Sequence, residues 1–206
     1  MSLAEAFAAV MSVEELPADG KARVEREFTY YAKLVDESQL DKANSREDQE
    51  QWSIRVAPSD TITYAGELRV RRCEKPGEEP RFILTSKTFK IGDFGKVESE
   101  TEVSEDMFLQ FRKLSNSGMI KTRYCFERTD GLVWEVDVYK SPDGQRIDWV
   151  KVDLEVKDDR EPPRDFPVEL TDVIGGDPRT RTEVERKQVA DILDNHFVLK
   201  NQYPKG

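Results

Sequence analysis

Three neighbouring segments of alternating side chains constrain the fold most. Residues 119–156 contain Ile120–Phe126, Val133–Tyr139 and Trp149–Val156, in which polar and apolar residues alternate. Successive side chains of a strand point to opposite faces, so this pattern predicts three strands that each have one apolar face. The simplest structure with this pattern is an antiparallel sheet whose other face is solvated.

The charges on these strands are sorted by sign. The first segment has two basic residues on its polar face, and each of the next two has two acidic residues: Lys121, Arg123, Glu135, Asp137, Asp153 and Glu155. An ordinary soluble surface mixes the two signs. Like charges two residues apart on one face repel each other unless a ligand or counter-ion lies between them, so the pattern favours a ligand-binding face.

Length and charge limit the class of protein. A chain of 206 residues usually forms one domain, and a net charge of -10 disfavours general binding to nucleic acid or anionic membranes. No segment approaches membrane-spanning length, and residues 1–7 lack the basic region of a signal peptide. Cys73 and Cys125 fall in predicted strands without metal-ligand spacing. We therefore expect reduced thiols and a cytoplasmic protein with no membrane partner.

The remaining strands are also charged on one face. Residues 23–31 predict a strand with Glu25, Glu27 and Thr29 on one side. The other predicted strands, residues 67–73, 82–89 and 96–103, carry further charges at alternate positions: Arg69, Arg71, Lys87, Glu98 and Glu100. Residues 36–51 are highly polar, which predicts a solvated helix or loop.

Helices are predicted between and beside the strands. Residues 2–12 have helical spacing and indicate an N-terminal extension over residues 1–20, before a main domain over residues 21–200. Ser104 is the expected N-cap of a helix that Gly118 ends and that covers an apolar face of the sheet. Thr182 and Glu185 form a capping-box pattern for a last helix. His196, at the end of that helix, is expected to have a surface or packing role.

Together these elements predict an α+β fold, with about eight antiparallel strands that close into a barrel and helices packed outside. The charged faces would then line a tunnel. Such a tunnel suits a polyphosphate carried with Mg²⁺ or Mn²⁺, because these hard ions take carboxylate oxygens while Arg and Lys take phosphate oxygens.

The order of the strands resembles the CYTH, or triphosphate tunnel metalloenzyme, superfamily. Its first strand reads ExExK, which residues 25–29 match except at the last position, and its LRxR strand resembles residues 68–71. The later motifs of the family fall on Lys87, Glu98, Glu100, residues 121–123, Asp137, Asp153 and Glu155. The resemblance covers residues 23 to about 195.

The resemblance implies metal-dependent hydrolysis of inorganic tripolyphosphate, a nucleoside triphosphate or an RNA 5′-triphosphate in a closed tunnel. It implies five substrate-binding cations, Arg69, Arg71, Lys87, Lys121 and Arg123. The implied catalytic residues are Glu25, Glu27, Asp153 and Glu155. The implied ligands of Mg²⁺ or Mn²⁺ are Glu25, Glu27, Glu98, Glu100, Asp137, Asp153 and Glu155. Thr29 replaces a lysine that contacts phosphate in the family, so either another cation compensates or the activity is altered.

Three other functions fit the same residues. The chain can be a noncatalytic polyphosphate-binding or nucleotide-binding module, a class IV-type adenylyl cyclase, or a structural barrel whose charged faces are solvated. The organic group attached to the triphosphate and the oligomeric state are both left open by the sequence.

Overall fold

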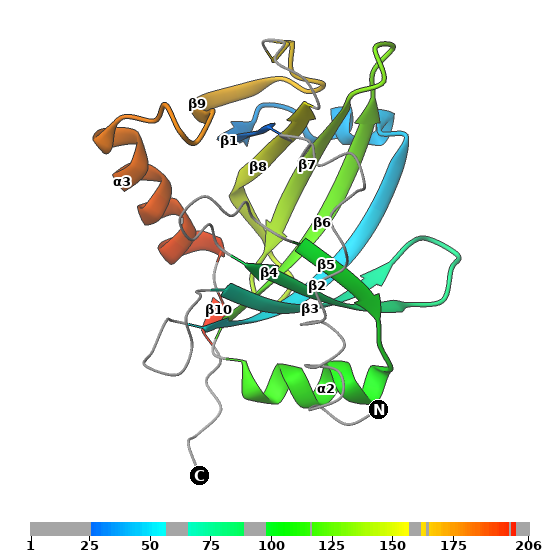
Figure 1. Ribbon diagram of the computed structural model, residues 1–206. Helices are drawn as coiled ribbons and strands as arrows, with labels where there is room; N and C mark the ends of the chain where they lie inside the picture. The colour runs from blue at the N-terminus through cyan, green and yellow to red at the C-terminus, as the bar shows by residue number, and fades with distance from the viewer. Residues whose placement is uncertain are drawn as a thin grey trace, which may run out of the picture. The chain divides into compact units, whose positions relative to one another are not determined.

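The computed structural model describes residues 26–56, 66–88, 98–115, 117–156, 162–163, 165–197 and 199–200. Within these ranges the chain forms ten strands and two α-helices, with a short 3₁₀ helix and a short π-helix (Figure 1). The predicted N-terminal extension and Glu25 lie outside the described residues. No helix in the described part of the chain has the length and apolar character needed to cross a membrane.

All the strands belong to one sheet. They are β1 (Arg26–Leu34), β2 (Ser45–Val56), β3 (Gly66–Glu74), β4 (Arg81–Thr88), β5 (Glu98–Glu102), β6 (Ser117–Glu127), β7 (Val133–Lys140), β8 (Arg146–Val156), β9 (Leu170–Gly176) and β10 (Leu199–Lys200). Hydrogen bonding follows the order β5-β4-β3-β2-β6-β7-β8-β1-β9, and β10 pairs with β6. This path has two ends, so the sheet of the described residues is not closed. The antiparallel sheet is confirmed, and closure into a barrel is not.

Contacts between residues divide the chain into two compact units. Of the described residues, the first unit comprises those within 50–118 together with Lys200, and the second comprises those within 26–49 and 119–199. Strand β2 contributes its first part to the second unit and its remainder to the first.

In the first unit, α2 (Glu105–Leu114) covers the apolar face of β3 and β4. Leu68, Val70 and Leu84 pack there against Phe108 and Phe111. Ser104 caps the helix by accepting a hydrogen bond from the Met107 amide, as predicted.

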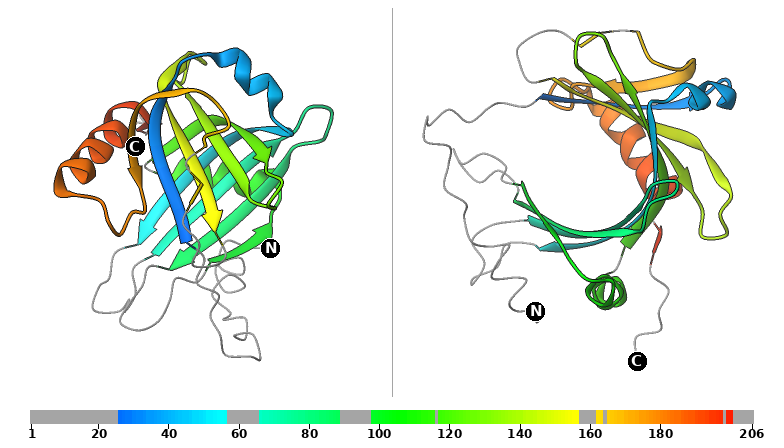
Figure 2. Two further views of the ribbon diagram at one scale, coloured as in Figure 1. Left: turned by 90° about the horizontal axis from the view of Figure 1, so that it is seen from above. Right: turned by 90° about the vertical axis from the view of Figure 1, so that its right-hand side faces the viewer.

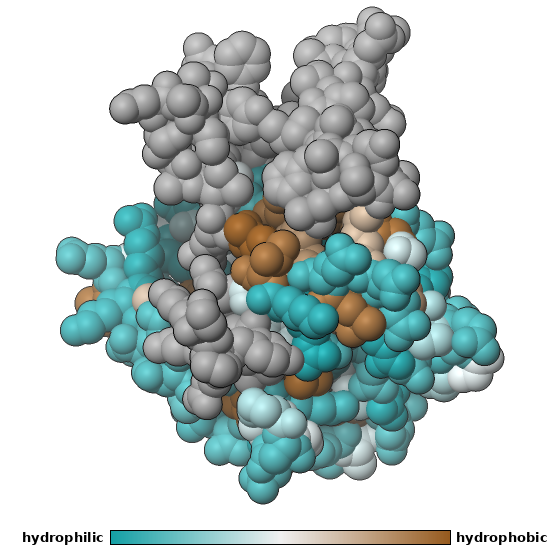
Figure 3. All heavy atoms as spheres, turned by 90° about the horizontal axis from the view of Figure 1, so that it is seen from below, coloured by the Kyte–Doolittle hydropathy of each residue, from teal (hydrophilic) through white to brown (hydrophobic). Residues whose placement is uncertain are grey.

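Figure 3 shows one face of the molecule. Its coloured residues are mostly hydrophilic, and several apolar residues lie among them.

The predicted end of this helix was wrong. The helix ends at Leu114, and Gly118 lies in β6 instead. A Cβ atom at Gly118 would lie 2.5 Å from Cε3 of Trp52, so glycine is needed here because an indole ring packs against the backbone. Close packing, rather than helix termination, explains this glycine.

The prediction of a solvated helix or loop for residues 36–51 was confirmed for the first part of this segment and was wrong from Ser45 onward. Residues Glu37–Lys42 form the 3₁₀ helix η1, but residues from Ser45 onward belong to β2. The first half of β2 is polar on both faces, so it lacks the hydrophobic alternation that indicates a strand. It nevertheless buries polar side chains, since Gln49 and Gln51 are only 4% and 7% exposed.

In the second unit, β6, β7, β8, β1 and β9 lie side by side and have one apolar face. Phe28, Trp134, Val136, Val152 and Leu154 are buried there in one cluster. The three strands predicted in residues 119–156 are confirmed as β6, β7 and β8.

The opposite face of the second unit carries charged residues and, beside them, the aromatic residues Tyr31 and Tyr139, which are covered by other elements. The covering elements are α3 (Glu183–Ile192) and the π-helix η2 (Leu193–Phe197). Phe197 stacks on Tyr139 with ring centroids 3.8 Å apart, and Tyr31 joins the same cluster. Figure 2 shows α3 beside β9. The predicted capping box between Thr182 and Glu185 is present at the start of α3.

Candidate functional site

The second unit gathers the charged residues of four neighbouring strands on one face. Directly opposite residues of an antiparallel pair point to the same side of the sheet. The register places Glu27 opposite Glu155 and Thr29 opposite Asp153. It also places Lys151 opposite Asp137. We define the charged face as Glu27, Thr29, Lys121, Arg123, Glu135, Asp137, Lys151, Asp153 and Glu155.

The centre of the charged face is a buried carboxylate between two cations. Asp137 is fully buried and Lys121 is 6% exposed. Lys121 Nζ lies 2.5 Å from Asp137 Oδ2, and Arg123 donates from Nε to Oδ1 at 2.7 Å and from Nη2 to Oδ2 at 2.9 Å. Both oxygens of Asp137 are therefore engaged by cations. In this arrangement Asp137, a predicted metal ligand, holds Lys121 and Arg123 in place.

Burial and charge shift the pKa values of these groups in different directions. Burial alone would raise the pKa of Asp137, but Lys121 and Arg123 outweigh it and hold this pKa well below its usual range. Burial lowers the pKa of Lys121 to about 8, because the attraction of Asp137 offsets only part of the desolvation. Burial alone would lower the pKa of Arg123. The negative charges of Asp137 and Glu135 have the larger effect, so the pKa of Arg123 is raised.

Glu135 occupies the remaining edge of the Arg123 guanidinium. Arg123 Nη1 lies 2.5 Å from Glu135 Oε2, and the Glu135 side chain is 35% exposed. Burial raises the pKa of Glu135 above its ordinary value. Arg123 thus binds one buried carboxylate, Asp137, and one partly exposed carboxylate, Glu135.

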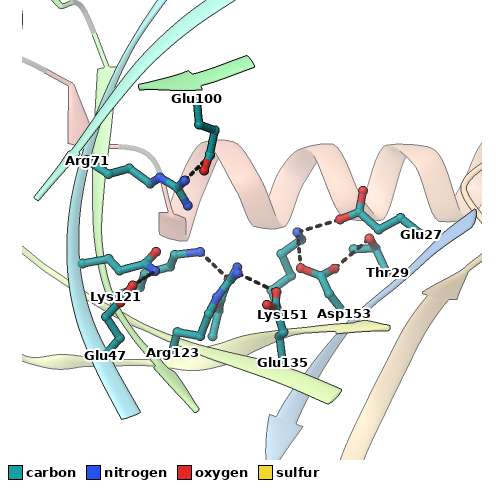
Figure 4. Close-up of polar contacts among 12 residues, drawn as sticks. Glu27, Thr29, Glu47, Arg71, Glu100, Lys121, Arg123, Glu135, Lys151 and Asp153 are labelled. Atoms are coloured by element: carbon teal, nitrogen blue, oxygen red, sulfur yellow. Dashed lines mark hydrogen bonds and ion pairs between the residues drawn. The ribbon is translucent and has the colours of Figure 1, made fainter. Parts of the chain in front are cut away.

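A second cluster lies on β1 and β8. Lys151 Nζ is 2.5 Å from Asp153 Oδ2 and 3.7 Å from Glu27 Oε1. Thr29 Oγ1 donates to the other carboxylate oxygen of Asp153, Oδ1, at 2.8 Å. Burial alone would lower the pKa of Lys151. The negative charges of Asp153, Asp137 and Glu27 have the larger effect, so the pKa of Lys151 is raised. These four side chains form one connected group (Figure 4).

Lys151 was missed as a site residue by the sequence prediction. Its position two residues before Asp153 places it on the acidic face of β8. The period-two alternation that selected Asp153 and Glu155 therefore also selects Lys151. The prediction counted β8 as an acidic strand because it considered only the two carboxylates.

The first unit has a charged face of its own. Glu100 Oε1 accepts a hydrogen bond from Thr85 Oγ1 at 2.9 Å and forms an ion pair with Arg71. The register places Arg69 opposite Thr85, so Arg69 points to the same side, and alternation places Lys87 there too. The Nε atom of Arg71 is buried and has no hydrogen-bond partner within the described residues.

The predicted site residues thus fall into two groups. Lys121, Arg123 and four carboxylates, Glu27, Asp137, Asp153 and Glu155, share the charged face of the second unit. Arg69, Arg71, Lys87 and Glu100 share one face of the first unit. Glu98 lies in β5 opposite Lys87. Convergence of all five predicted cations on one ligand stays a prediction.

The carboxylates of the charged face are the side chains that could hold a divalent ion. Among the described residues, no group of three or more ligand side chains is arranged to hold one. Glu27 and Glu155 lie directly opposite each other on β1 and β8 and are both exposed. Like charges directly opposite in a sheet are destabilising, and a shared hard cation relieves this repulsion. The chemistry of this pair therefore suits a hard divalent ion such as Mg²⁺ or Mn²⁺, whose further ligands would have to come from outside these two side chains.

No protein-family model and no curated protein matches the sequence. Among solved structures, the chain is similar to the inorganic triphosphatase NE1496, with a TM-score of 0.46 and 18% identity over 79% of this chain and 93% of that one. It is also similar to the PH1819 protein from Pyrococcus horikoshii OT3, with a TM-score of 0.40 and 17% identity over 66% of this chain and 80% of that one.

A third similar structure is the putative adenylyl cyclase HpAC1 from Hippeastrum, described as having a dominant triphosphatase activity. Its TM-score is 0.39 at 13% identity, over 88% of this chain and 93% of that one. NE1496 and HpAC1 are CYTH proteins, the family that the strand motifs resemble. Because these TM-scores are below 0.5, the similarity does not extend an activity or a substrate to this chain.

Proposed function

We propose that this chain binds a triphosphate-containing ligand on the charged face and hydrolyses it with the help of Mg²⁺ or Mn²⁺. The observation that carries this proposal is the combination of three cations with five carboxylates on β6, β7, β8 and β1. Cations alone would suit any anion. Cations beside an excess of carboxylates suit a polyphosphate that arrives with a divalent ion, because the two kinds of group need opposite partners.

The cations would bind the phosphate oxygens. Asp137 fixes Lys121 and Arg123 before the ligand arrives, so less side-chain freedom is lost on binding. A phosphate oxygen would take the place of Glu135 at Nη1 of Arg123. This exchange suits arginine, whose planar fork binds carboxylate and phosphate with the same geometry.

The carboxylates would hold the ion and position water. Glu27 and Glu155 would bind Mg²⁺ or Mn²⁺, which when bound neutralises phosphoryl charge and lowers the pKa of a coordinated water. Attack of water on the terminal phosphorus breaks its bond to the bridging oxygen and releases orthophosphate and diphosphate from tripolyphosphate. Lys121 and Arg123 would stabilise the negative charge that develops on the leaving oxygen and the equatorial oxygens.

Phosphate release tests this proposal. Tripolyphosphate, ATP and a short RNA 5′-triphosphate are each incubated with the protein and with Mg²⁺, Mn²⁺ or a chelator. Orthophosphate released from at least one substrate, and only with a divalent ion, is the expected result. Pyrophosphate released from ATP would identify a cyclase instead. No release and no binding in any arm would overturn the proposal.

A second candidate, a noncatalytic polyphosphate-binding module, is favoured by one observation. Thr29 and Lys151 already donate to both oxygens of Asp153, so this predicted catalytic carboxylate is engaged within the protein. Saturable binding of tripolyphosphate without phosphate release would select this candidate. The same substrate panel therefore separates the two functions, provided that binding is measured by calorimetry alongside release.

A further inference from the structure

Lys151 holds together the carboxylates of two strands. Its Nζ atom lies 2.5 Å from Asp153 Oδ2 on the same strand and 3.7 Å from Glu27 Oε1 on the neighbouring strand β1. The Lys151 side chain is 22% exposed, whereas that of Asp153 is 7% exposed. The ammonium is therefore mostly buried, and it forms ion pairs with the carboxylates of both Glu27 and Asp153.

This position is also the one that a divalent ion shared by Glu27 and Asp153 would need. Mg²⁺ and Mn²⁺ bind carboxylate oxygens directly, at about 2 Å. An ammonium that already contacts these oxygens excludes such an ion by its volume and by its like charge. The second oxygen of Asp153 accepts a hydrogen bond from Thr29 Oγ1, so it is engaged as well.

We propose that the Lys151 ammonium is a resident cation of the site. It occupies the position between Glu27 and Asp153 that a divalent ion would otherwise take, and metal binding is left to Glu27 together with Glu155. The hydrogen bond to Asp153 uses one of the three protons of Nζ, and Glu27 is an ion-pair partner at 3.7 Å. Another proton of Nζ is suited to a phosphate oxygen of a polyphosphate. This contact with phosphate rests on the proposed function, whereas the exclusion of a second ion does not.

The exclusion is tested by counting Mn²⁺ ions, without any substrate, by electron paramagnetic resonance and calorimetry. Lys151→Met removes the charge while keeping an unbranched side chain of similar length. This variant is expected to bind one Mn²⁺ more per chain than the wild type, or to bind Mn²⁺ at least tenfold more tightly. Adding Asp153→Asn to Lys151→Met should abolish the gain. Unchanged Mn²⁺ binding in Lys151→Met would overturn the proposal.

Two further variants serve as controls. Lys33 lies on the same face of β1 and forms an exposed ion pair with Asp172 at 2.9 Å, so Lys33→Met removes a paired lysine outside the proposed position. It should leave Mn²⁺ binding unchanged. Lys151→Arg keeps the positive charge and should also bind Mn²⁺ as the wild type does. If Lys151→Met does not fold, Lys151→Gln keeps a hydrogen-bond donor for Asp153 and is measured in the same way.

The proposed contact between Lys151 and a phosphate oxygen is tested in a separate binding experiment. Tripolyphosphate binding is measured with a chelator present, so that Lys151 acts without any divalent ion. Lys151→Met should weaken this binding about tenfold or more, the loss expected for one hydrogen bond to a charged group. Equal affinity of the wild type and Lys151→Met would overturn the phosphate contact. If tripolyphosphate binds to neither protein but Lys151→Met gains Mn²⁺, the resident cation stands and the proposed function fails.

Discussion

The hydroxyl of Thr29 donates a hydrogen bond to Oδ1 of Asp153, 2.8 Å away on the neighbouring strand. Both residues are 5% exposed, so this contact is almost fully buried. Lys151 binds the other oxygen of the same carboxylate. In the family that the strand motifs resemble, the position of Thr29 holds a lysine. Lys151 reaches Asp153 and Glu27 from β8 instead of β1, and we propose that it supplies the cation that is missing at position 29.

This relationship predicts how a lysine at position 29 will behave. Thr29→Lys alone should not tighten tripolyphosphate binding, because its ammonium would crowd that of Lys151 beside the same carboxylate. In a Lys151→Met background, the same substitution should restore most of the affinity that Lys151→Met loses. Calorimetry on the wild type, both single variants and the double variant measures the coupling between the two positions.

Additive effects of Thr29→Lys and Lys151→Met on tripolyphosphate affinity would contradict the idea that a lysine at either position fills the same role. A gain of affinity from Thr29→Lys in the wild-type background would show that the two ammonium groups do not compete for Asp153.

Asp137 should matter for folding as well as for binding. Asp137→Asn leaves Lys121 and Arg123 buried without their main counter-charge, and removing one partner of a buried ion pair costs about 3–5 kcal/mol. Urea unfolding of the variant measures this loss. Asp172→Asn is the matched control: it breaks the exposed ion pair with Lys33 and should cost less than about 1 kcal/mol. Equal losses in the two variants would show that Asp137 is not the centre of a buried cluster.

Binding should depend on pH through Lys121. The pKa of this buried lysine is lowered to about 8, so it is protonated at pH 7 and largely neutral at pH 9. Tripolyphosphate affinity should therefore fall by about tenfold as pH rises through 8, because one charged donor is lost. Lys121→Arg is the control, since arginine stays protonated while the ligand titrates in the same way. Parallel pH curves for the wild type and Lys121→Arg would contradict this prediction.

Much of the fold could be predicted from the sequence, because the strands of the second unit have a strong period-two pattern. Strands β6, β7 and β8, the N-cap Ser104 and the capping box of α3 are all confirmed. The first part of β2, from Ser45 to Gln51, was missed, since this part is polar on both faces and buries glutamines instead of apolar residues. Gly118 was misassigned because its constraint comes from Trp52, which is distant in sequence and cannot be inferred from local spacing.

For the site, alternation predicted which side chains share a face, but not which of them pair. The pairing of Asp137 with Lys121 and Arg123 depends on the register between β6 and β7 and on burial. The sequence prediction treated these cations as ready for phosphate and Asp137 as ready for a metal. The structure joins them to one another. The same alternation also places Lys151 on this face, but the prediction considered only the carboxylates of β8 and therefore missed it.

The metal prediction concerns the cross-strand pair. Glu27→Gln and Glu155→Gln each remove one of the two carboxylates best placed for a divalent ion, at nearly constant volume. Each should weaken Mn²⁺ binding at least tenfold and reduce metal-dependent phosphate release, while the melting temperature stays close to that of the wild type. Glu169→Gln, at an exposed position outside the charged face, is the control. Wild-type Mn²⁺ binding in both variants would remove this pair from the site.

The central claim is that polyphosphate binds to the charged face of the second unit, and NMR tests it most directly. A ¹H–¹⁵N spectrum is recorded while Mg²⁺ and tripolyphosphate are added, and both the backbone amides and the arginine Nε–H groups are followed. We predict saturable shifts of the Arg123 Nε–H signal and of the amides of Glu27 and Asp153. The amides of Asp130 and Asp143, in turns between strands of the same unit, should stay in place. Shifts at the turns alone, or no shift at concentrations where calorimetry detects binding, would contradict the claim.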